Sequence, residues 1–430
     1  MKVLLLGSGG REHAIAWALA KSPNVEALWI APGNGGTDGM QLTTGAVSEN
    51  VSLDPMDIDA VVSFAKDNGV DLAVIGPENP LVAGVADALR EAGISVYGPN
   101  AAEAQLEGSK EYAKEFMTKA GIPTARYESF TECEPALEYV REQGAPIVIK
   151  ADGLAAGKGV VVAETEEAAE DAVRACFDGA FGDAGAKVVI EECMTGPECS
   201  MLSFVTDGKS FPMAPSQDHK RAYEGDTGPN TGGMGVYSPV PIVTDDEMEA
   251  MVDIMATAAA AVPEYKGTLY GGFMLTPEGP KIVEYNVRFG DPETQVVLPR
   301  LKSDLAEVMM AVAEGRAEEI DLDWDDSWAV GVVLASEGYP GSYEKGKVIL
   351  GIDDAEDMDD VIVFHAGTSI NEDGEVLTAG GRVLNVVALG DTFEDARARA
   401  YEACDLIEFE GKQLRRDIGL KASKGRSSWE

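Results

Sequence analysis

The first hundred residues alternate short apolar runs with helix-like stretches, and this alternation constrains the fold more than any other feature of the chain. The apolar runs occupy residues 2–7, 25–33, 71–79 and 94–100, and the helix-like stretches occupy 11–22, 56–69 and 85–93. Apolar strands that alternate with helices form a parallel sheet covered on both faces. We therefore expect a doubly wound α/β domain over residues 1–100.

Glycine-rich polar loops follow the strands of this predicted domain, at the sheet edge where α/β folds bind ligands. The first loop reads GSGGRE, but Glu12 stands where a dinucleotide-binding motif needs its third glycine. The second strand ends in APGN rather than in an acid. Both departures argue against NAD or FAD. The loop can still hold a phosphate through backbone N–H groups at a helix N-terminus, or it is simply a tight turn.

The pattern changes after residue 100. A helix is predicted at 107–121 and a compact mixed segment at 123–190, and the stretch KVVIEECMTGPECSMLSFV reads as two strands joined by a turn. Apolar runs after about residue 325 indicate a β-rich end to the chain. We expect an α+β body at 101–325 and a small β-rich C-terminal domain at 326–430.

The chain carries 75 acidic residues against 34 basic ones, for a formal net charge of -41. Such a surface argues against nucleic-acid binding, because phosphate backbones need a basic surface. Dispersed acidic residues suit high salt, so we expect a salt-loving source. The sequence has no leader-like or membrane-spanning apolar stretch, and its five cysteines form no C-x-x-C pair. We expect a cytoplasmic protein with reduced thiols.

Residues 146–163, PIVIKADGLAAGKGVVVA, place two lysines around a glycine-rich loop. A Walker A loop opens a helix, whereas Gly157 and Lys158 here precede a second apolar strand. Two strands with such a turn form a flap whose N–H groups and lysine can close over phosphates. Lys150, at the end of the first strand, can reach the α- and β-phosphates. The alternative is a surface hairpin with solvated lysines.

Three glutamates follow the flap. Glu191 and Glu192 end an apolar strand, and Glu198 follows a Gly-Pro turn. The backbone at such a strand end can pair with an adenine, and an acid beyond it can bind ribose hydroxyls. Charged strand ends are common, so this pattern supports a nucleotide site only in combination with the flap.

Residues 281–295, KIVEYNVRFGDPETQ, form the densest chemical cluster. Glu284 and Asn286 are two apart on a predicted strand and therefore face the same side. A carboxylate and an amide oxygen are hard ligands that suit Mg²⁺. Arg288 continues this face and can clamp a phosphate or carboxylate, while Asp291 can orient an amine or the waters of the metal. The alternative is an exposed strand with alternating polar residues.

Residues 216–235, SQDHKRAYEGDTGPNTGGMG, form a long polar loop rich in glycine. Loops of this kind are more often functional than idle. Lys220 and Arg221 are candidate anion contacts. His219 is one of only three histidines, and an isolated histidine is more often structural than an acid or base.

These clusters, in this order, resemble the phosphoribosylamine–glycine ligases, which are ATP-grasp enzymes of purine biosynthesis. The resemblance covers essentially the whole chain and rests on GSGGREHA, APGNGGT, GPENPLVAG, QLEGSK, SQDHKR, DTGPNTGGMG, RFGDPETQ and FHAGT. It implies an N-terminal preATP-grasp domain, an ATP-grasp body with a mobile lid at about 123–190, and a C-terminal β domain. It also implies that ATP converts glycine into glycyl phosphate. The amine of 5-phosphoribosylamine then attacks this intermediate, and the products are glycinamide ribonucleotide, ADP and phosphate.

The resemblance also implies roles for individual residues. It gives ATP contacts at Lys110, Lys150, Gly157, Lys158, Glu191, Glu192 and Glu198; ligands for Mg²⁺ or Mn²⁺ at Glu284 and Asn286; a reaction centre at Arg288, Asp291, Asp218 and Lys220; and substrate contacts at Gly9, Gly10, Asn34, Gly35, Glu78 and Arg221. The strand LYGGFML lacks the acid or glutamine that many ATP-grasp enzymes place there. A second metal held by the protein is therefore in doubt.

Other interpretations stay open at this point. They are a biotin carboxylase-like or other ATP-grasp ligase, and a non-catalytic nucleotide-binding regulator. The motifs SQDHKR and DTGPNTGGMG favour the glycine ligase. We expect only small-molecule partners, glycine and 5-phosphoribosylamine, and a monomer or weak dimer.

Overall fold

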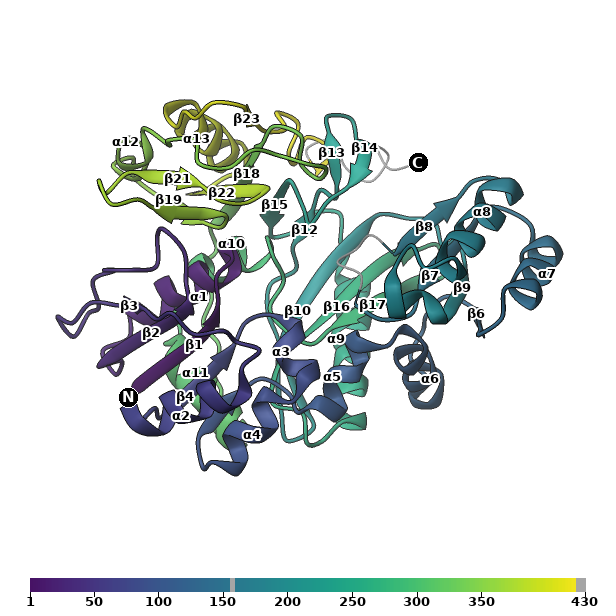
Figure 1. Ribbon diagram of the computed structural model, residues 1–430, viewed down its shortest axis with the longest axis horizontal. Helices are drawn as coiled ribbons and strands as arrows, with labels where there is room; N and C mark the ends of the chain where they lie inside the picture. The colour runs from purple at the N-terminus through teal and green to yellow at the C-terminus, as the bar shows by residue number, and fades with distance from the viewer. Residues whose placement is uncertain (155–158, 423–430) are drawn as a thin grey trace.

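The computed structural model describes residues 1–154 and 159–422. Figure 1 shows the N-terminal sheet at the lower left, a C-terminal β-rich unit above it, a central body, and a separate small unit at the right that carries α7 and α8. Within the described ranges, none of the helices is both long and apolar enough to cross a membrane.

The N-terminal unit confirms the predicted doubly wound domain. Its five parallel strands have the order β3-β2-β1-β4-β5. The strands are β1 (Lys2–Gly7), β2 (Ala27–Pro32), β3 (Glu49–Asn50), β4 (Leu72–Ile75) and β5 (Ser95–Tyr97), and the helices are α1 (Gly10–Ala20), α2 (Ile58–Asn68), α3 (Glu78–Ala83) and α4 (Val85–Glu91). Asp57 caps the start of α2 by accepting from the Ala60 N–H, and Gly69 ends it with φ 64°. The sequence indicates Gly69 as the end of this helix, and the structure confirms it.

The core of this unit includes a segment from far along the chain. The segment contains α10 (Thr294–Val297), the 3₁₀ turn η2 (Leu298–Arg300) and α11 (Leu305–Glu314), followed by η3 (Ala317–Glu319). Met309 and Val312 of α11 pack in one buried cluster with Leu5 and Val74 of the parallel sheet. One face of the sheet is therefore completed by residues more than two hundred positions away.

The central body is a four-stranded sheet of order β11-β10-β16-β17. Its strands are β10 (Glu198–Thr206), β11 (Lys209–Pro212), β16 (Gly267–Thr276) and β17 (Gly279–Asn286), and its helices are α5 (Ala101–Gly108), α6 (Lys110–Ala120) and α9 (Asp245–Ala261). Met255 of α9 packs in the same buried cluster as Phe273 and Ile282. This packing leaves the C-terminal end of β17 free to line the candidate functional site.

The small unit at the right of Figure 1 has its own sheet, of order β6-β9-β7-β8. It consists of β6 (Tyr127–Phe130), α7 (Cys133–Gln143), β7 (Ile147–Ala151), β8 (Val160–Ala163), α8 (Glu166–Phe177), η1 (Gly182–Ala186) and β9 (Val188–Glu192). We call it the lid. The two strands expected around the turn at 193–197 both exist, but β9 belongs to the lid and β10 to the body. The turn is therefore a connection between two sheets.

Within the described residues the C-terminal sheet has six strands. Five follow one another in a continuous order, and the sixth pairs with one of them at the side. Some of these strands come from the middle of the chain. Its members are β12 (Gln217–Asp218), β15 (Gly235–Ser238), β18 (Trp328–Ser336), β19 (Val361–His365), β22 (Arg382–Gly390) and β23 (Lys412–Gln413). Nearby lie the small hairpins β13 (Arg221–Tyr223) with β14 (Thr227–Asn230) and β20 (Thr368–Ile370) with β21 (Val376–Thr378), and the helices α12 (Ile352–Glu356) and α13 (Phe393–Leu406). Since β12 and β15 pair into this sheet, no single cut in the sequence separates body from C-terminal unit.

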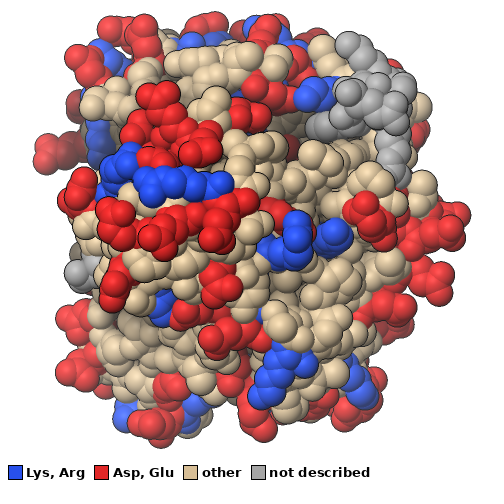
Figure 2. Space-filling view, turned by 90° about the vertical axis from the view of Figure 1, so that its right-hand side faces the viewer, with Lys and Arg blue, Asp and Glu red and all other residues tan. Residues whose placement is uncertain are grey.

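On the face of the molecule seen in Figure 2, the acidic residues are spread out rather than gathered in one place. Figure 2 shows one face on which Asp and Glu occur all round, with Lys and Arg in smaller groups among them. This distribution fits the formal net charge of -41. Around the cavity inside the molecule, the balance between acidic and basic side chains is different.

Candidate active site

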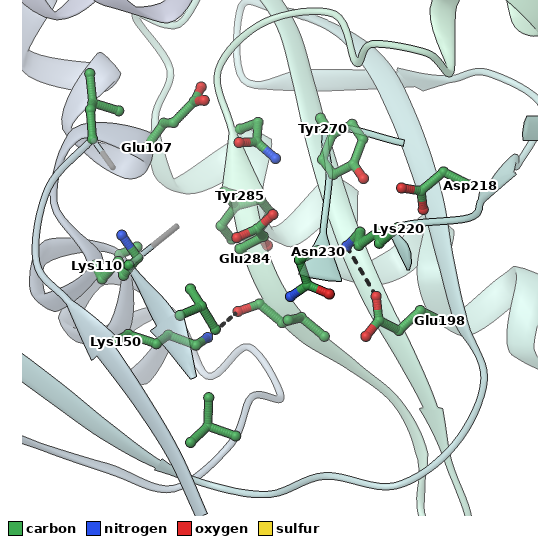
Figure 3. A pocket seen from close by; sticks show the side chains of 18 of the residues that line it. Glu107, Lys110, Lys150, Glu198, Asp218, Lys220, Asn230, Tyr270, Glu284 and Tyr285 are labelled. Carbon is green, nitrogen blue, oxygen red and sulfur yellow. Dashed lines mark hydrogen bonds and ion pairs between the residues drawn. The ribbon is translucent and has the colours of Figure 1, made fainter. Parts of the chain in front are cut away.

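A cavity of about 670 Å³ lies where the four units meet. Each unit contributes polar side chains to its lining: Arg11 and Glu78 from the N-terminal unit; Glu107, Lys110, Lys114, Glu284, Asn286 and Arg288 from the body; Lys150 and Glu191 from the lid; and Asp218, Lys220 and Arg382 from the C-terminal sheet and its approaches. In Figure 3, Lys110 and Lys150 lie on one side of Glu284, and Lys220, Glu198 and Asp218 lie on the other.

Three lysines gather at the end of the cavity between the lid and α6. The Lys150 and Lys114 ammonium groups lie 2.8 and 2.9 Å from the two carboxylate oxygens of Glu191. The side chains of Lys150, Lys114 and Glu191 are almost fully buried. Lys110 begins α6 and donates to the Gly153 carbonyl at 2.8 Å. The sequence prediction brought Lys110 and Lys150 to one site, and the structure places them there. Gly157 and Lys158 lie outside the described residues.

The connection from lid to body lines this same end. Glu192, Cys193 and Met194 border the cavity, as the expected adenine-binding strand end requires. The Glu192 carboxylate accepts from Arg126 at 2.7 Å, and the Glu198 carboxylate accepts from Lys220 at 3.0 Å. The carboxylate of Glu191 is committed to two lysines, so its side chain supports this end of the cavity rather than facing it openly.

Glu284 and Asn286 lie on the same side of β17 and both line the cavity, as their spacing predicts. Among the described residues the Glu284 carboxylate has neither a hydrogen bond nor an ion pair. Burial alone would raise its pKa, but the charges of Lys220, Lys150 and Lys110 outweigh that effect and lower the pKa. A carboxylate that is ionised, buried and uncommitted, beside an amide oxygen, fits a hard cation such as Mg²⁺.

The protein supplies few ligands for such a cation. Within the described ranges, no group of three or more His, Cys, Asp or Glu side chains could hold a metal ion. On the neighbouring strand, Gly272 pairs with Glu284 and offers no side chain. Any metal here must therefore take most of its ligands from bound phosphates and water.

Another part of the cavity pairs each arginine with carboxylates. Arg288 lies 2.8 Å from Glu107 and 3.5 Å from Glu78, and its guanidinium also donates to the Asn286 amide oxygen at 3.2 Å. Arg11 donates to Glu12 at 2.6 Å. Burial would raise the pKa of Glu78, but Arg288 and Arg11 lower it overall. We call this arginine-rich part the acceptor end.

Arg382 reaches the acceptor end from the C-terminal sheet. Its guanidinium donates to the carbonyls of Gly232 and Asp291, each at 2.8 Å, and lies 3.3 Å from the Asp291 carboxylate. Burial would raise the pKa of Asp291, but Arg382 and Arg11 lower it. Arg382 thus ties together β22, the loop before β15 and the Gly-Asp-Pro turn. Sequence analysis missed it, because nothing near Arg382 marks it as different from other surface arginines.

The loop that carries SQDHKR places two of its side chains in the cavity. Burial raises the pKa of Asp218 to about 7, although Lys220 opposes the shift. Lys220 has a raised pKa because Glu198 and Asp218 face it. His219 between them points away: it accepts from the Gly419 N–H at 3.0 Å, and burial lowers its pKa to about 4. His219 is thus a neutral structural residue, as the sequence favoured.

Several expected substrate contacts lie outside the cavity lining. The Asn34 amide donates to the Ser8 and His365 carbonyls, both at 2.9 Å, and so joins the N- and C-terminal units. Gly35 donates to Thr368, and a side chain at Gly10 would meet Gln295. The Gly9 N–H donates to Glu12 at 2.6 Å, so it is already used and is not free to cradle a phosphate. The Arg221 guanidinium, which is exposed, donates to the Gly228 carbonyl at 2.8 Å.

Two more residues of the site were passed over at the sequence level. Glu107 lies in the quoted motif QLEGSK, yet only its lysine was singled out; its burial beside Arg288 makes it a member of the acceptor end. Lys114 lies one helical turn after Lys110 on α6. Lysines four apart share a helix face, and that spacing was the available signal.

The comparisons with known proteins agree with this geometry. Three families match in chain order: "Phosphoribosylglycinamide synthetase, N domain" at residues 1–107, its "ATP-grasp (A) domain" at 108–294 and its "C domain" at 329–421. A phosphoribosylamine–glycine ligase of Vibrio parahaemolyticus is 50% identical over 98% of both chains. One of Escherichia coli O157:H7 is 51% identical over 98% of this chain and 99% of its own.

Solved structures point the same way. The crystal structure of a phosphoribosylamine–glycine ligase from Thermotoga maritima is 36% identical, with a TM-score of 0.82 over 97% of this chain and all of its own. A "Biotin Carboxylase-beta-gamma-ATP Complex" from Campylobacter jejuni has a TM-score of 0.75 at 17% identity, over 98% of this chain and 95% of its own, and shares the fold alone. The comparisons lend no support to the expected salt-loving source, which stays a prediction. By its full-length match to these proteins, the chain belongs to the phosphoribosylamine–glycine ligase family of ATP-grasp enzymes.

Proposed function

We propose that the protein ligates glycine to 5-phosphoribosylamine at the expense of ATP in purine biosynthesis, through glycyl phosphate, with glycinamide ribonucleotide, ADP and phosphate as products. One observation carries the proposal beyond the family name. The uncommitted Glu284 carboxylate lines the same cavity as the lysine-rich end and the acceptor end, and the charges of Lys150, Lys110 and Arg288 act on it. That arrangement suits phosphoryl transfer, which depends on cations and alignment more than on a protein nucleophile.

At the lysine-rich end, Lys110 and Lys150 hold the triphosphate. The backbone at Glu192 pairs with the adenine, and Glu198 lies at the ribose. Glu284 and Asn286 would hold Mg²⁺ or Mn²⁺, and the bound ion would supply positive charge that neutralises the phosphates. The ionised state of Glu284 and its position opposite Gly272 support one such ion.

At the acceptor end, the side chains align the two substrates. Arg288 and Lys220 draw the glycine carboxylate toward the γ-phosphate and stabilise charge on the acyl phosphate. Asp291, held ionised by Arg382 and Arg11, orients the amine. Asp218 is the group best placed to accept a proton from that amine, because burial brings its pKa to about 7. 5-Phosphoribosylamine lies beside Glu78, between the N-terminal unit and the loop with Asp218 and Lys220. The loops at Gly9, Gly10, Asn34 and Gly35 and the exposed Arg221 surround this part of the site without lining the cavity.

The test is a product assay with isotopically labelled glycine. We expect labelled glycinamide ribonucleotide and an equal amount of ADP, only when ATP, a divalent cation, glycine and 5-phosphoribosylamine are all present. Bicarbonate in place of glycine should give no turnover. ADP release with bicarbonate would favour a biotin carboxylase-like enzyme instead. Tight ATP binding with no turnover on any carboxylate and amine pair would favour a non-catalytic regulator.

A further inference from the structure

Glu191 bridges two lysines in the interior, and the two lysines differ in how their donors are used. An ammonium group has three N–H donors. Lys114 lies 2.9 Å from Glu191 and donates to the Thr124 hydroxyl at 2.8 Å and the Ala125 carbonyl at 3.4 Å. All of its donors therefore have partners within the protein, and its side chain is only 2% exposed.

Lys150 keeps one donor in reserve among the described residues. It lies 2.8 Å from Glu191 and donates to the Val283 carbonyl at 3.3 Å. Figure 3 shows Lys150 and Lys110 on the same side of the cavity. Of the two lysines on Glu191, Lys150 is thus the one that can bind an anion without losing a partner.

The charges of this cluster do not cancel. One buried carboxylate faces two ammonium groups, so the cluster carries one surplus positive charge. Interactions between buried charges are far stronger than those between exposed charges. Without Lys114, Glu191 would neutralise Lys150 alone, and an incoming polyphosphate would meet a neutral ion pair. With Lys114 present, the carboxylate is shared and the surplus charge stays at the cavity wall.

The cluster also joins the lid to the body. Lys150 and Glu191 come from lid strands β7 and β9, and Lys114 comes from α6. The Thr124 hydroxyl, which accepts from Lys114, donates to the Ile282 carbonyl on β17 at 2.7 Å. Lys114 is therefore anchored beside the strand that carries Glu284.

We propose that Lys114 is a positioning residue that, through Glu191, orients Lys150 and leaves its charge available to the triphosphate of ATP. The inference rests on the proposed use of ATP, and it assigns a task to a residue that does not itself touch the nucleotide.

The test measures ATP dissociation constants at equilibrium, without glycine, by titration calorimetry. Lys114→Met should weaken binding ~10-fold or more, the scale of losing one buried charge interaction. Lys114→Arg should stay close to the unmodified protein, because it keeps the charge. Lys119→Met is the matched control, an exposed lysine on the same helix, and should change nothing.

The decisive variant is the double substitution Lys114→Met with Glu191→Gln. Removing the carboxylate as well frees the charge of Lys150, so the double variant should recover most of the affinity that Lys114→Met loses. A residue that only stabilised the fold would show no such recovery. If Lys114→Met binds ATP as tightly as the unmodified protein, or if the double variant binds no better than Lys114→Met, the inference is wrong. If the unmodified protein binds no ATP, the proposed function itself fails.

A second measurement does not depend on how well Lys114→Met folds. Burial lowers the pKa of Lys114 to about 8, although Glu191 opposes the shift. The other groups that face it are Lys150, Glu192 and the ring of Tyr127. ATP affinity of the unmodified protein should therefore fall as the pH rises through about 8, since Lys114 then loses its proton. Lys114→Arg cannot deprotonate there and should lack this part of the fall. Identical pH profiles for the two proteins would overturn the inference.

Discussion

The two ends of the cavity handle charge in opposite ways. At the lysine-rich end, Lys114 and Lys150 share the single carboxylate of Glu191. At the acceptor end, Arg288 alone faces two carboxylates, Glu107 and Glu78. The first end has a surplus of positive charge and the second is balanced or slightly negative, although both are lined by basic side chains.

This difference tells what each end can bind. A surplus cation with an uncommitted donor attracts a strongly charged anion such as a triphosphate. A balanced set of guanidiniums and carboxylates offers directional hydrogen bonds instead, and suits a small zwitterion such as glycine. Substitutions where the two ends meet, and then within each end, can test this contrast.

The largest effect is expected at Glu284, where the two ends meet. Glu284→Ala should lower turnover by ~10²–10³-fold, the range found when one group that stabilises developing charge is removed. The variant should stay folded, because this carboxylate has no ion pair or hydrogen bond among the described residues. Steady-state kinetics and thermal unfolding check both points. Glu278→Ala, at the exposed turn before the same strand, should leave turnover unchanged. Near-normal turnover in a folded Glu284→Ala protein would remove the metal assignment.

Removing one cation from the acceptor end should mainly lower the unfolding free energy, whereas removing one from the lysine-rich end should mainly lower ATP affinity. Arg288→Gln leaves the buried Glu107 side chain and the half-buried Glu78 side chain without this partner, so it should cost ~3 kcal/mol of unfolding free energy in addition to activity. Burial already raises the pKa of Glu107 despite Arg288. The ionised form of such a carboxyl destabilises the fold, so the loss of unfolding free energy should shrink as the pH is lowered and Glu107 takes up a proton. Urea unfolding measures this.

Lys150→Met is the counterpart at the lysine-rich end. Glu191 keeps Lys114 as its partner, so the unfolding free energy should change much less than in Arg288→Gln. ATP affinity should instead fall ~10-fold or more. The contrast between the two ends is wrong if Lys150→Met proves as destabilising as Arg288→Gln while ATP binding is kept.

A smaller effect is expected at Arg382. Arg382→Lys keeps the charge but cannot reach three acceptors in one plane, so Asp291 should be less well held. The kcat/KM for glycine should fall ~10-fold, while the ATP dissociation constant stays the same. Lys345→Ala, an exposed cation of the same C-terminal unit, is the control. A loss of ATP affinity equal to the loss for glycine would show that Arg382 does not belong to the acceptor end alone.

Local patterns predicted the parts of this site that lie on single elements. The period of two on a strand puts Glu284 and Asn286 on one side, and the strand–helix alternation of the first hundred residues gives the parallel sheet and its ligand edge. Lys150 and Lys110 were found because motifs mark them. Each of these inferences needs only neighbours in sequence.

The parts that were missed depend on contacts between distant segments. Arg382 meets Asp291 across ninety-one positions, and α11 completes a sheet that begins at Lys2. Glu191 looked like an acid at an adenine-binding strand end, but its partner Lys114 comes from another unit, and only their meeting shows that the carboxylate is shared. Contacts between distant segments also decide which of two adjacent loop side chains faces a cavity.

Lys220 and Arg221 are such a pair, and substitution of Arg221 gives the smallest expected effect. Lys220 lines the cavity and bonds Glu198, whereas Arg221 is exposed and its guanidinium bonds the Gly228 carbonyl within its own hairpin. Arg221→Ala should therefore change kcat/KM for 5-phosphoribosylamine by less than about twofold, while Lys220→Ala should reduce turnover ~10²-fold. Steady-state kinetics with each substrate varied in turn compares the two. A large rise in KM for 5-phosphoribosylamine in Arg221→Ala alone would show that the hairpin swings over the acceptor when it binds, and would extend the acceptor end beyond the cavity described here.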